Sequence, residues 1–569
     1  MTTLDSSQVN RKEQLLVALN KLGKGSTFLY MIFILTTIPA CFNGMHSMAY
    51  IFIAEIPEHW CSIPILHSAN WTNDQIRNIS SASPCTQYDY DYNHFAKIGF
   101  EEALKYKNDN PTVKVTECKV RSFEQNLDGT SLVEDWDLVC DRLADRSTIQ
   151  MMFSLGKLLG SALSGVISDK YGRKFVYNIG IIMLILSGPI SAIVPWYWCF
   201  LILRLINGIS HAAILYPSFT LLTETAGEKH RQWMGVAYNA GYPIGTTIMA
   251  CIAYVLYDWR HKQLASTLPA LILLLFMWLM PESPRWLLSQ NRINEAQKVI
   301  EKYYRSDNEE AEVIETYSSS IMHKPILQSQ LEERKNSKSN STNISQGNKL
   351  KETLKGLVVV LCNYELLKRV MITNFAWLTA SLTYYALALN VDNFSANRYL
   401  YILVMGITEV PAYLIPTPIL IYVGRKQACA VMYSLTALLL LSILAIPAKE
   451  TLAIIIVALT ARFILSAAYS IMILYTSELF PTITRNSAVG SSSAMSHVGS
   501  VASPYVADLL GAIAWWAPST LCGFCALLSG LLSMMLPETR GRPLADTIDE
   551  EITKERGVVE FKNCFICKS

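Results

Sequence analysis

Long apolar segments separated by short polar ones dominate the chain. Twelve windows are long enough to cross the apolar core of a bilayer, which takes about 20 residues, and the charged residues collect between them. Six spans are expected in the first half, at 26–50, 147–167, 175–195, 196–222, 233–257 and 264–280. Six more are expected at 369–389, 397–422, 427–446, 451–476, 487–509 and 513–536. The pattern predicts an all-α polytopic membrane protein.

Composition supports this fold class. Of the 569 residues, 51% are hydrophobic and 17% are charged, whereas a typical soluble chain has roughly 25% charged residues. The net charge of +2 gives no reason to expect a nucleic-acid partner. Residues 1–25 are polar and lack the short apolar core and cleavage site of a signal peptide, so the first span is expected to insert the chain itself.

Basic residues between the spans predict the topology. Under the positive-inside rule, most lysines and arginines in the short connections fall on one side, with Arg260, Lys262 and Arg398 as exceptions. We therefore expect a cytoplasmic N-terminus (1–25), six-span halves at 26–280 and 369–536, a cytoplasmic loop (281–368) and a cytoplasmic tail (537–569). The Ser/Asn/Lys-rich stretch 329–351 cannot bury a core and is expected to be disordered.

The polar segment 51–145 contains four of the thirteen cysteines: Cys61, Cys85, Cys118 and Cys140. An even cluster in one large loop predicts two disulfides in an oxidising compartment, and four cysteines allow three pairings. Two glycosylation sequons in the same loop, at Asn70 and Asn78, agree with an extracellular location.

The two halves repeat each other. Glu224 and Arg231 recur as Glu478 and Arg485, both displaced by 254 residues, and Arg173 recurs as Arg425, displaced by 252. The sequence Pro-Glu-Ser at 281–283 likewise recurs as Pro-Glu-Thr at 537–539. An even number of spans gives both halves the same orientation, which is typical of transporters whose halves rock about a central site. These charged residues, together with Asp169 in the turn 165–174, are expected to form a gate at the cytoplasmic face, with Asp169 joining the two halves when that face is closed.

Candidate binding residues are ionisable or aromatic groups within the spans. Glu409 lies near the middle of the eighth span, where a charge is costly and usually functional. It is expected either to face a cationic substrate or to form a buried salt bridge with Lys157 or Arg462. His497 can titrate near neutral pH or be a core histidine. Aromatic rings can attract a cation, and the candidates are Trp377, Tyr384, Tyr385, Tyr216, Tyr238 and Tyr242.

No catalytic motif is recognised in the sequence. It contains no nucleotide-binding Gly-rich loop followed by Lys-Ser/Thr, no clustered metal ligands and no nucleophile elbow. We therefore expect neither an enzyme nor a resident cofactor or metal, and gradients or the membrane potential must supply the energy.

The chain resembles the organic cation, organic anion and carnitine/zwitterion transporters of the major facilitator superfamily over nearly its full length. The matching stretches are PEHWC (57–61), DWDLVC (135–140), DKYGRK (169–174), PESPRWL (281–287), ELFPT (478–482) with Arg485, and PETRG (537–541). The first two, which bound the outer loop, are not shared with sugar porters.

The resemblance implies transport of small organic ions across the plasma membrane by alternating access, by a monomer or a homo-oligomer formed through the loop. Glu409, followed by Val-Pro, matches the substrate-contacting acid of the cation branch, and Trp377 and Tyr384 match its aromatics. His497 departs from it, because the cation branch resembles Asp there and the anion and carnitine branches Arg. With Lys157, this suits a zwitterion at least as well as a simple cation. Organic-anion exchange is the alternative within transport, and a sensor or adhesion protein that works through the cysteine loop and does not transport is the alternative from another class.

Overall fold

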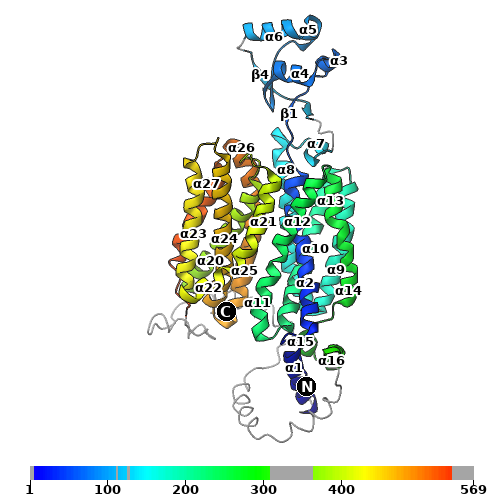
Figure 1. The fold of residues 1–569 in the computed structure, drawn as a ribbon, viewed down its shortest axis with the longest axis vertical. Coiled ribbons are helices and arrows are strands. Elements are labelled where there is room, and N and C mark those ends of the chain that lie inside the picture. Colours follow the sequence, from blue (N-terminus) through cyan, green and yellow to red (C-terminus); the bar gives the residue numbers. More distant parts are fainter. Residues whose placement is uncertain (1–5, 111–112, 125–128, 308–362, 541–569) are drawn as a thin grey trace, which may run out of the picture.

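Two groups of helices stand side by side, and a small subdomain projects from one end of them (Figure 1). The computed structural model describes residues 6–110, 113–124, 129–307 and 363–540. The expected disordered stretch 329–351 and the tail from 541 onward lie outside the described residues. Below, the end that carries the subdomain is called the loop end, and the opposite end, where the turn 169–174 lies, is called the turn end.

The N-terminal half contains the first six predicted spans. They are α2 (Thr27–Ile53), α8 (Leu143–Tyr171), α9 (Arg173–Ile193), α10 (Tyr197–Thr225), the consecutive helices α11 (Glu228–Asn239) and α12 (Gly241–Val255), and the run α13 (Trp259–Thr267), η2 (Leu268–Leu271) and α14 (Ile272–Leu279). All six lie close to their predicted positions.

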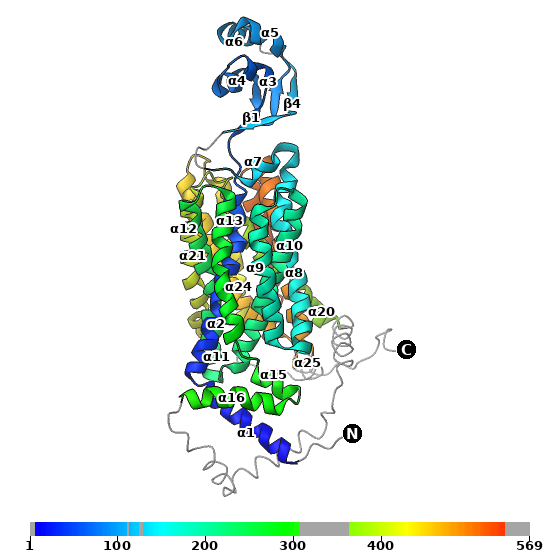
Figure 2. The ribbon, with the colours of Figure 1, turned by 90° about the vertical axis from the view of Figure 1, so that its right-hand side faces the viewer.

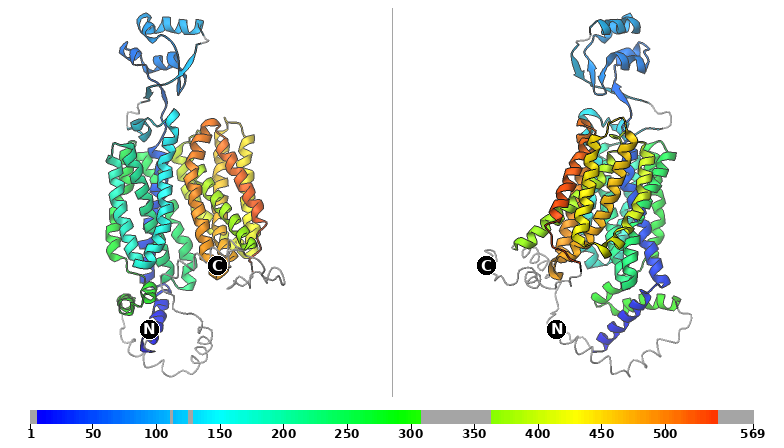
Figure 3. Two further views of the ribbon diagram at one scale, coloured as in Figure 1. Left: turned by 180° about the vertical axis from the view of Figure 1, so that it is seen from behind. Right: turned by 60° about the vertical axis from the view of Figure 1, so that its left-hand side comes forward.

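The C-terminal half contains the other six. They are α20 (Tyr364–Leu389), α21 (Arg398–Leu414) with α22 (Pro416–Tyr422), α23 (Arg425–Ser442) with η4 (Ile443–Ala445), α24 (Thr451–Leu479), α25 (Thr482–Tyr505) with the π-helical η5 (Val506–Leu510) and α26 (Gly511–Ile513), and α27 (Ala517–Ser533). Figure 3 shows this half beside the first from two further directions. The predicted all-α polytopic fold is confirmed.

Some spans are interrupted where the sequence predicted continuous helices. Seven helical segments of the described chain are long and apolar enough to cross a membrane unbroken. The fifth span breaks between α11 and α12 and the eighth between α21 and α22, each beside a proline (Pro243 or Pro416) in the first turn of the following helix. Proline has no backbone N–H to donate, so it is tolerated there but interrupts the hydrogen-bond ladder before it.

The projecting subdomain is built from short strands and helices. Strands β1 (His59–Cys61) and β5 (Arg121–Phe123) pair antiparallel, and β2 (Ser81–Ser83), β3 (Thr86–Tyr88) and β4 (Val115–Glu117) form a second antiparallel sheet. The helices are α3 (Pro64–Ser68), α4 (Asn73–Ser80), α5 (Tyr92–Ile98), α6 (Phe100–Asp109), α7 (Leu132–Trp136) and η1 (Cys140–Arg142). Of the three pairings that the sequence allows, the structure has Cys61–Cys118 and Cys85–Cys140.

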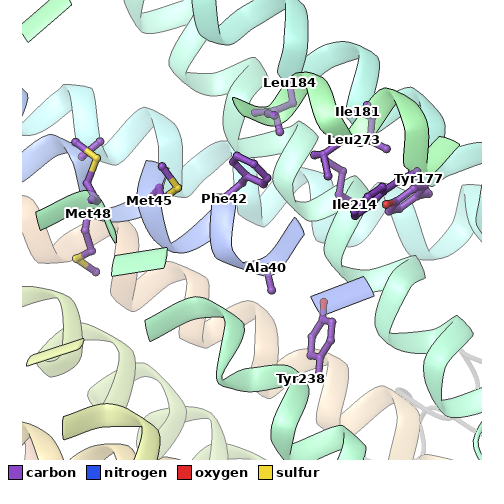
Figure 4. Close-up of a cluster of buried hydrophobic side chains, with 14 of the residues drawn as sticks. Ala40, Phe42, Met45, Met48, Tyr177, Ile181, Leu184, Ile214, Tyr238 and Leu273 are labelled. Atoms are coloured by element: carbon purple, nitrogen blue, oxygen red, sulfur yellow. The ribbon is translucent and has the colours of Figure 1, made fainter. Parts of the chain in front are cut away.

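Apolar side chains hold each part together. Between the helices of the N-terminal half, residues such as Phe42, Ile181 and Leu273 are buried in one cluster (Figure 4). At the turn end, α1 (Ser6–Leu22), α15 (Pro284–Ser289) and α16 (Ile293–Asp307) lie below the spans (Figure 2). Gly156 and Gly208 bring α8 and α10 into close contact, since a Cβ at Gly208 would lie 2.2 Å from the backbone oxygen of Phe153.

Candidate functional site

The turn between α8 and α9 carries a cluster of charges. Gly172 has a φ of 106°, a conformation that glycine adopts at little cost. Arg173 then pairs with Glu224 at 3.0 Å and with Asp169 at 3.1 Å. Glu282 accepts a hydrogen bond from the N–H of Arg173 (2.9 Å) at the start of α9, where a negative charge is favoured. Burial raises the pKa of the Glu282 carboxyl, and the N–H donors oppose that shift.

The same cluster occurs in the C-terminal half. Arg425 pairs with Glu478 at 3.1 Å, and Glu538 accepts from the N–H of Arg425 at 2.9 Å. Thr539 donates to Glu478 (2.6 Å), just as Ser283 donates to Glu224 in the first half. The repeat predicted from sequence landmarks is therefore present as two matching sets of contacts.

Arg231 and Arg485, which were also predicted to belong to the gate, take no part in these clusters. Arg231 donates to the carbonyl oxygen of Ala226 (3.2 Å), and Nε and Nη2 of Arg485 have no partner among the described residues. Asp169 pairs inside its own half. No ion pair between described residues joins the two halves at the turn end. The cross-half contact of Asp169 is thus absent from this conformation and stays a prediction.

At the loop end, by contrast, a buried ion pair joins the halves. Arg146 of α8 pairs with Asp508 of η5 at 2.7 Å, and each side chain is 4% exposed. Arg146 also contacts Asp392 at 3.2 Å. The other oxygen of Asp508 accepts from Tyr50 (2.9 Å) and Ser147 (2.7 Å). The second span was predicted to start at residue 147, but α8 begins at Leu143, because Arg146 has these carboxylate partners and need not remain in water.

The three basic residues that violate the positive-inside rule also have partners at the loop end. Arg398 pairs with Glu55 in the other half at 3.0 Å and with Asp392 at 3.2 Å. Arg260 pairs with Asp135 at 2.8 Å. Lys262, which is buried, donates to the carbonyl oxygen of Phe52 at 3.3 Å. Their charges stabilise contacts at this end, so their positions do not contradict the topology.

Glu409 lies deep in the C-terminal half, with its side chain 1% exposed. Its oxygens accept hydrogen bonds from the hydroxyl groups of Tyr384 (2.7 and 2.9 Å) and Tyr413 (2.7 Å). Arg462 of α24 lies 3.5 Å away and stacks on the Tyr384 ring, 3.7 Å from its centroid. Of the partners considered from sequence, the structure pairs Glu409 with Arg462 and leaves Lys157 elsewhere.

Lys157 of α8 lies in the other half, among aromatic rings. Its Nζ is 4.9 Å from the centroid of Phe153 and 5.9 Å from that of Tyr242. Tyr242 in turn lies 6.4 Å from Tyr384, which contacts Tyr385 edge to face at 5.1 Å. A row of tyrosines thus leads from a buried ammonium in one half to a buried carboxylate in the other.

Tyr216 and His497 form a further contact between the halves. The Tyr216 hydroxyl lies 2.8 Å from Nε2 of His497, which links α10 to α25. Tyr216 is nevertheless 38% exposed. The Tyr216 side chain therefore contacts the opposite half and remains partly exposed.

Trp377 is not part of the Glu409 cluster. Its indole N–H donates to Thr476 (3.0 Å), and its ring packs against Tyr469 at 5.2 Å. Sequence reasoning missed Tyr469 and Tyr413. Tyr413 follows Glu409 by four residues and therefore lies on the same helical face, a signal that was available. Tyr238, another sequence candidate, packs on Phe219 and donates to the carbonyl oxygen of Leu215 (3.1 Å).

Two matching six-helix halves, with charged and aromatic groups buried between and within them and buried ion pairs across one end, define a multi-pass membrane transporter rather than an enzyme. The sugar (and other) transporter family model matches residues 105–550. The chain belongs to this family.

Its relatives cover nearly the whole chain. It is 28% identical over 533 residues to an organic cation transporter protein of Drosophila melanogaster (93% of each chain). It is 29% identical over 566 residues to solute carrier family 22 member 16 of Xenopus laevis (95% of each). It is 29% identical over 558 residues to organic cation/carnitine transporter 2 of Rattus norvegicus (95% of this chain, 94% of the relative).

Solved structures agree on the fold. The inward-open conformation of the xylose transporter XylE from E. coli has a TM-score of 0.56 with this structure, at 16% identity, and covers 91% of this chain and 98% of its own. At that identity the likeness concerns the fold alone.

Proposed function

We propose that the protein transports small organic cations or zwitterions, such as carnitine-like or amine-bearing compounds, across the plasma membrane by alternating access. The observation that carries the proposal is the buried carboxylate of Glu409 within a group of tyrosines. An ammonium group is attracted by a carboxylate and by the faces of aromatic rings. Each ring face contributes about 0.5–2 kcal/mol. The cation and carnitine transporters among the relatives support the same substrate class.

Lys157 favours a zwitterion over a simple cation. The Glu409–Arg462 pair is neutral overall, so Lys157 leaves an excess positive charge on the opposite half. A substrate that carries both an ammonium and a carboxylate can place one near Glu409 and the other near Lys157, across the tyrosine row. Organic-anion exchange through Lys157, Arg462 and His497 is less favoured, because Arg462 already has a carboxylate partner.

The disulfides support an orientation for the chain in the membrane. The loop end faces the extracellular medium, where disulfides form, and both Asn70 and Asn78 are exposed there for glycosylation. The turn end and both termini face the cytoplasm. The ion pairs that join the halves at the loop end support a conformation that is closed on the outer side.

Uptake of labelled substrates by expressing cells tests the proposal. The panel consists of carnitine, tetraethylammonium, carcinine, β-alanine and an aromatic anion, with vector-transfected cells as the control. We expect uptake of at least one cation or zwitterion and little of the anion. Uptake of the anion alone would overturn the proposal, and no uptake of any compound by protein that reaches the surface would favour a sensor that does not transport.

A further inference from the structure

A group of basic side chains is buried inside the N-terminal half, outside the contacts described for Glu409. His46 of α2 and His211 and Arg204 of α10 are each 0% exposed, and Lys157 of α8 is 8% exposed. The two imidazole rings lie 5.0 Å apart. The Phe153 ring lies among them, 5.8 Å from the His211 ring and 5.9 Å from the Arg204 guanidinium carbon.

Most polar atoms of this group lack partners. Among the described residues, none of the four ring nitrogens of His46 and His211 has a hydrogen-bond partner, and neither do Nε and Nη2 of Arg204. The remaining Nη1 of Arg204 reaches only the carbonyl oxygen of His46, at 3.5 Å. Native proteins rarely leave buried donors unpaired, and such atoms point to a bound water or ion.

The charge of this group is also uncompensated. Two other arginines buried in the spans, Arg146 and Arg462, each pair with a carboxylate. Arg204 and Lys157 form no ion pair with any described residue. Burying an unpaired charge is costly, and although water can complete hydrogen bonds it cannot neutralise a charge. An anion can do both.

The surrounding packing limits the size of that anion. Helices α8 and α10 are in close contact at Gly156 and Gly208, next to Phe153 and His211. A Cβ at Gly156 would lie 2.2 Å from the backbone oxygen of Leu205. With the three principal side chains fully buried, an organic carboxylate has no access unless the helices separate. We propose that His46, His211 and Arg204 bind a buried halide ion, chloride in physiological salt, and that Lys157 adds favourable charge from the side of the tyrosine row.

Chloride binding is tested on the purified full-length protein in detergent. Thermal unfolding is followed in sodium gluconate while chloride replaces gluconate at constant ionic strength and pH. A ligand that binds only the folded state at about 100 times its dissociation constant raises Tm by about 2–3 °C for a chain of this size. We expect a saturable rise of that order with chloride, and with bromide. Substrate is not needed, so the outcome is independent of the uptake panel.

Amino-acid substitutions test whether the chloride-dependent rise in Tm comes from this site. Arg204→Gln and His211→Gln should lose the chloride-dependent rise. The milder histidine substitution keeps the test decisive if Arg204→Gln fails to fold. Lys262→Gln, which removes a buried cation that has a carbonyl partner at the loop end, is the matched control and should retain it. A Tm that is the same in gluconate and chloride, or a rise that survives in both site variants, would overturn the proposal.

Discussion

Glu409 is a carboxylate with nearly all of its hydrogen-bonding capacity in use. Two tyrosine hydroxyls and one guanidinium share its two oxygens. The guanidinium contact, at 3.5 Å, is longer than the 2.7–2.9 Å or so of a strong charge-assisted bond. A substrate ammonium can therefore compete with Arg462 for Glu409 without first breaking a short ion pair.

Replacing Glu409 separates a binding role from a structural one. Glu409→Gln keeps an acceptor for both tyrosines but removes the negative charge, so we expect cation uptake to fall by about tenfold or more, since losing one partner of a buried charge pair costs 2–5 kcal/mol or so. Uptake of tetraethylammonium or carnitine, normalised to surface biotinylation, measures this. Tyr413→Phe, which removes one donor and no charge, is the control and should have a smaller effect. Unchanged uptake in Glu409→Gln would assign Glu409 to structure alone.

The Tyr216–His497 contact predicts a different effect. Tyr216→Phe removes the hydrogen bond between the halves but keeps the ring. Because the contact is partly exposed, its loss should cost only about 1 kcal/mol and change the transport rate several-fold at most, without loss of surface protein. Initial uptake rates over a range of substrate concentrations check this. A complete loss of transport would show that the pair acts directly on substrate.

At the scale of elements, η5 departs from regular α-helical geometry. Its π-helical turn, Val506–Leu510, places Asp508 against Arg146. Single π-helical turns inserted in α-helices occur often at functional sites. The buried ion pair between the halves at the loop end is therefore made from a local irregularity in the eleventh span.

Breaking this pair should shift the protein toward the outward-open state. Arg146→Gln leaves Asp508 buried without its charge partner, a loss of about 3–5 kcal/mol for the closed loop end. We expect strongly reduced uptake and faster labelling of a cysteine introduced near the loop end. The exchanged double variant, R146D with D508R, should restore part of the uptake. Arg398→Gln, whose side chain is 15% exposed, should have a weaker effect. Equal activity of wild type and Arg146→Gln would contradict the closure role.

Sequence patterns predicted the elements much better than the contacts between them. Hydropathy is a local property, so all twelve spans were found, but hydropathy does not mark the breaks beside Pro243 and Pro416. The pairing Cys61–Cys118 joins positions far apart in sequence, and no local signal selects it. Arg146 was placed at the edge of a loop because its partner Asp508 lies 362 residues away. Only Tyr413, one turn from Glu409, could have been found from spacing.

At the scale of the whole molecule, the two halves match in their charge clusters but differ in one acid. The residue that corresponds to Asp169, at the 252-residue displacement of Arg173 and Arg425, is Ile421. Asp169 is 63% exposed although it pairs with Arg173. The N-terminal turn therefore offers a carboxylate that can leave its present partner and reach the other half, whereas the C-terminal turn does not.

This asymmetry predicts an effect of Asp169→Asn. Losing the carboxylate should destabilise the closed turn end, slow transport several-fold, and increase the labelling of Phe219→Cys by a thiol reagent applied to the cytoplasmic side, since Phe219 is 39% exposed on α10. Uptake and labelling in inside-out vesicles measure the two effects. Ile421→Asn, at the matching position, serves as the control. Unchanged transport and labelling would leave the turn only as a marker of topology.

The disulfide Cys85–Cys140 fastens the projecting subdomain to the residue that begins η1, directly before α8. Any molecule that immobilises the subdomain from the medium therefore also restrains the helix that carries Arg146. An antibody fragment raised against α5 and α6 should lower the maximal uptake rate and leave the apparent KM unchanged, as measured in intact cells. Such a fragment would be a noncompetitive inhibitor that never enters the transport pathway.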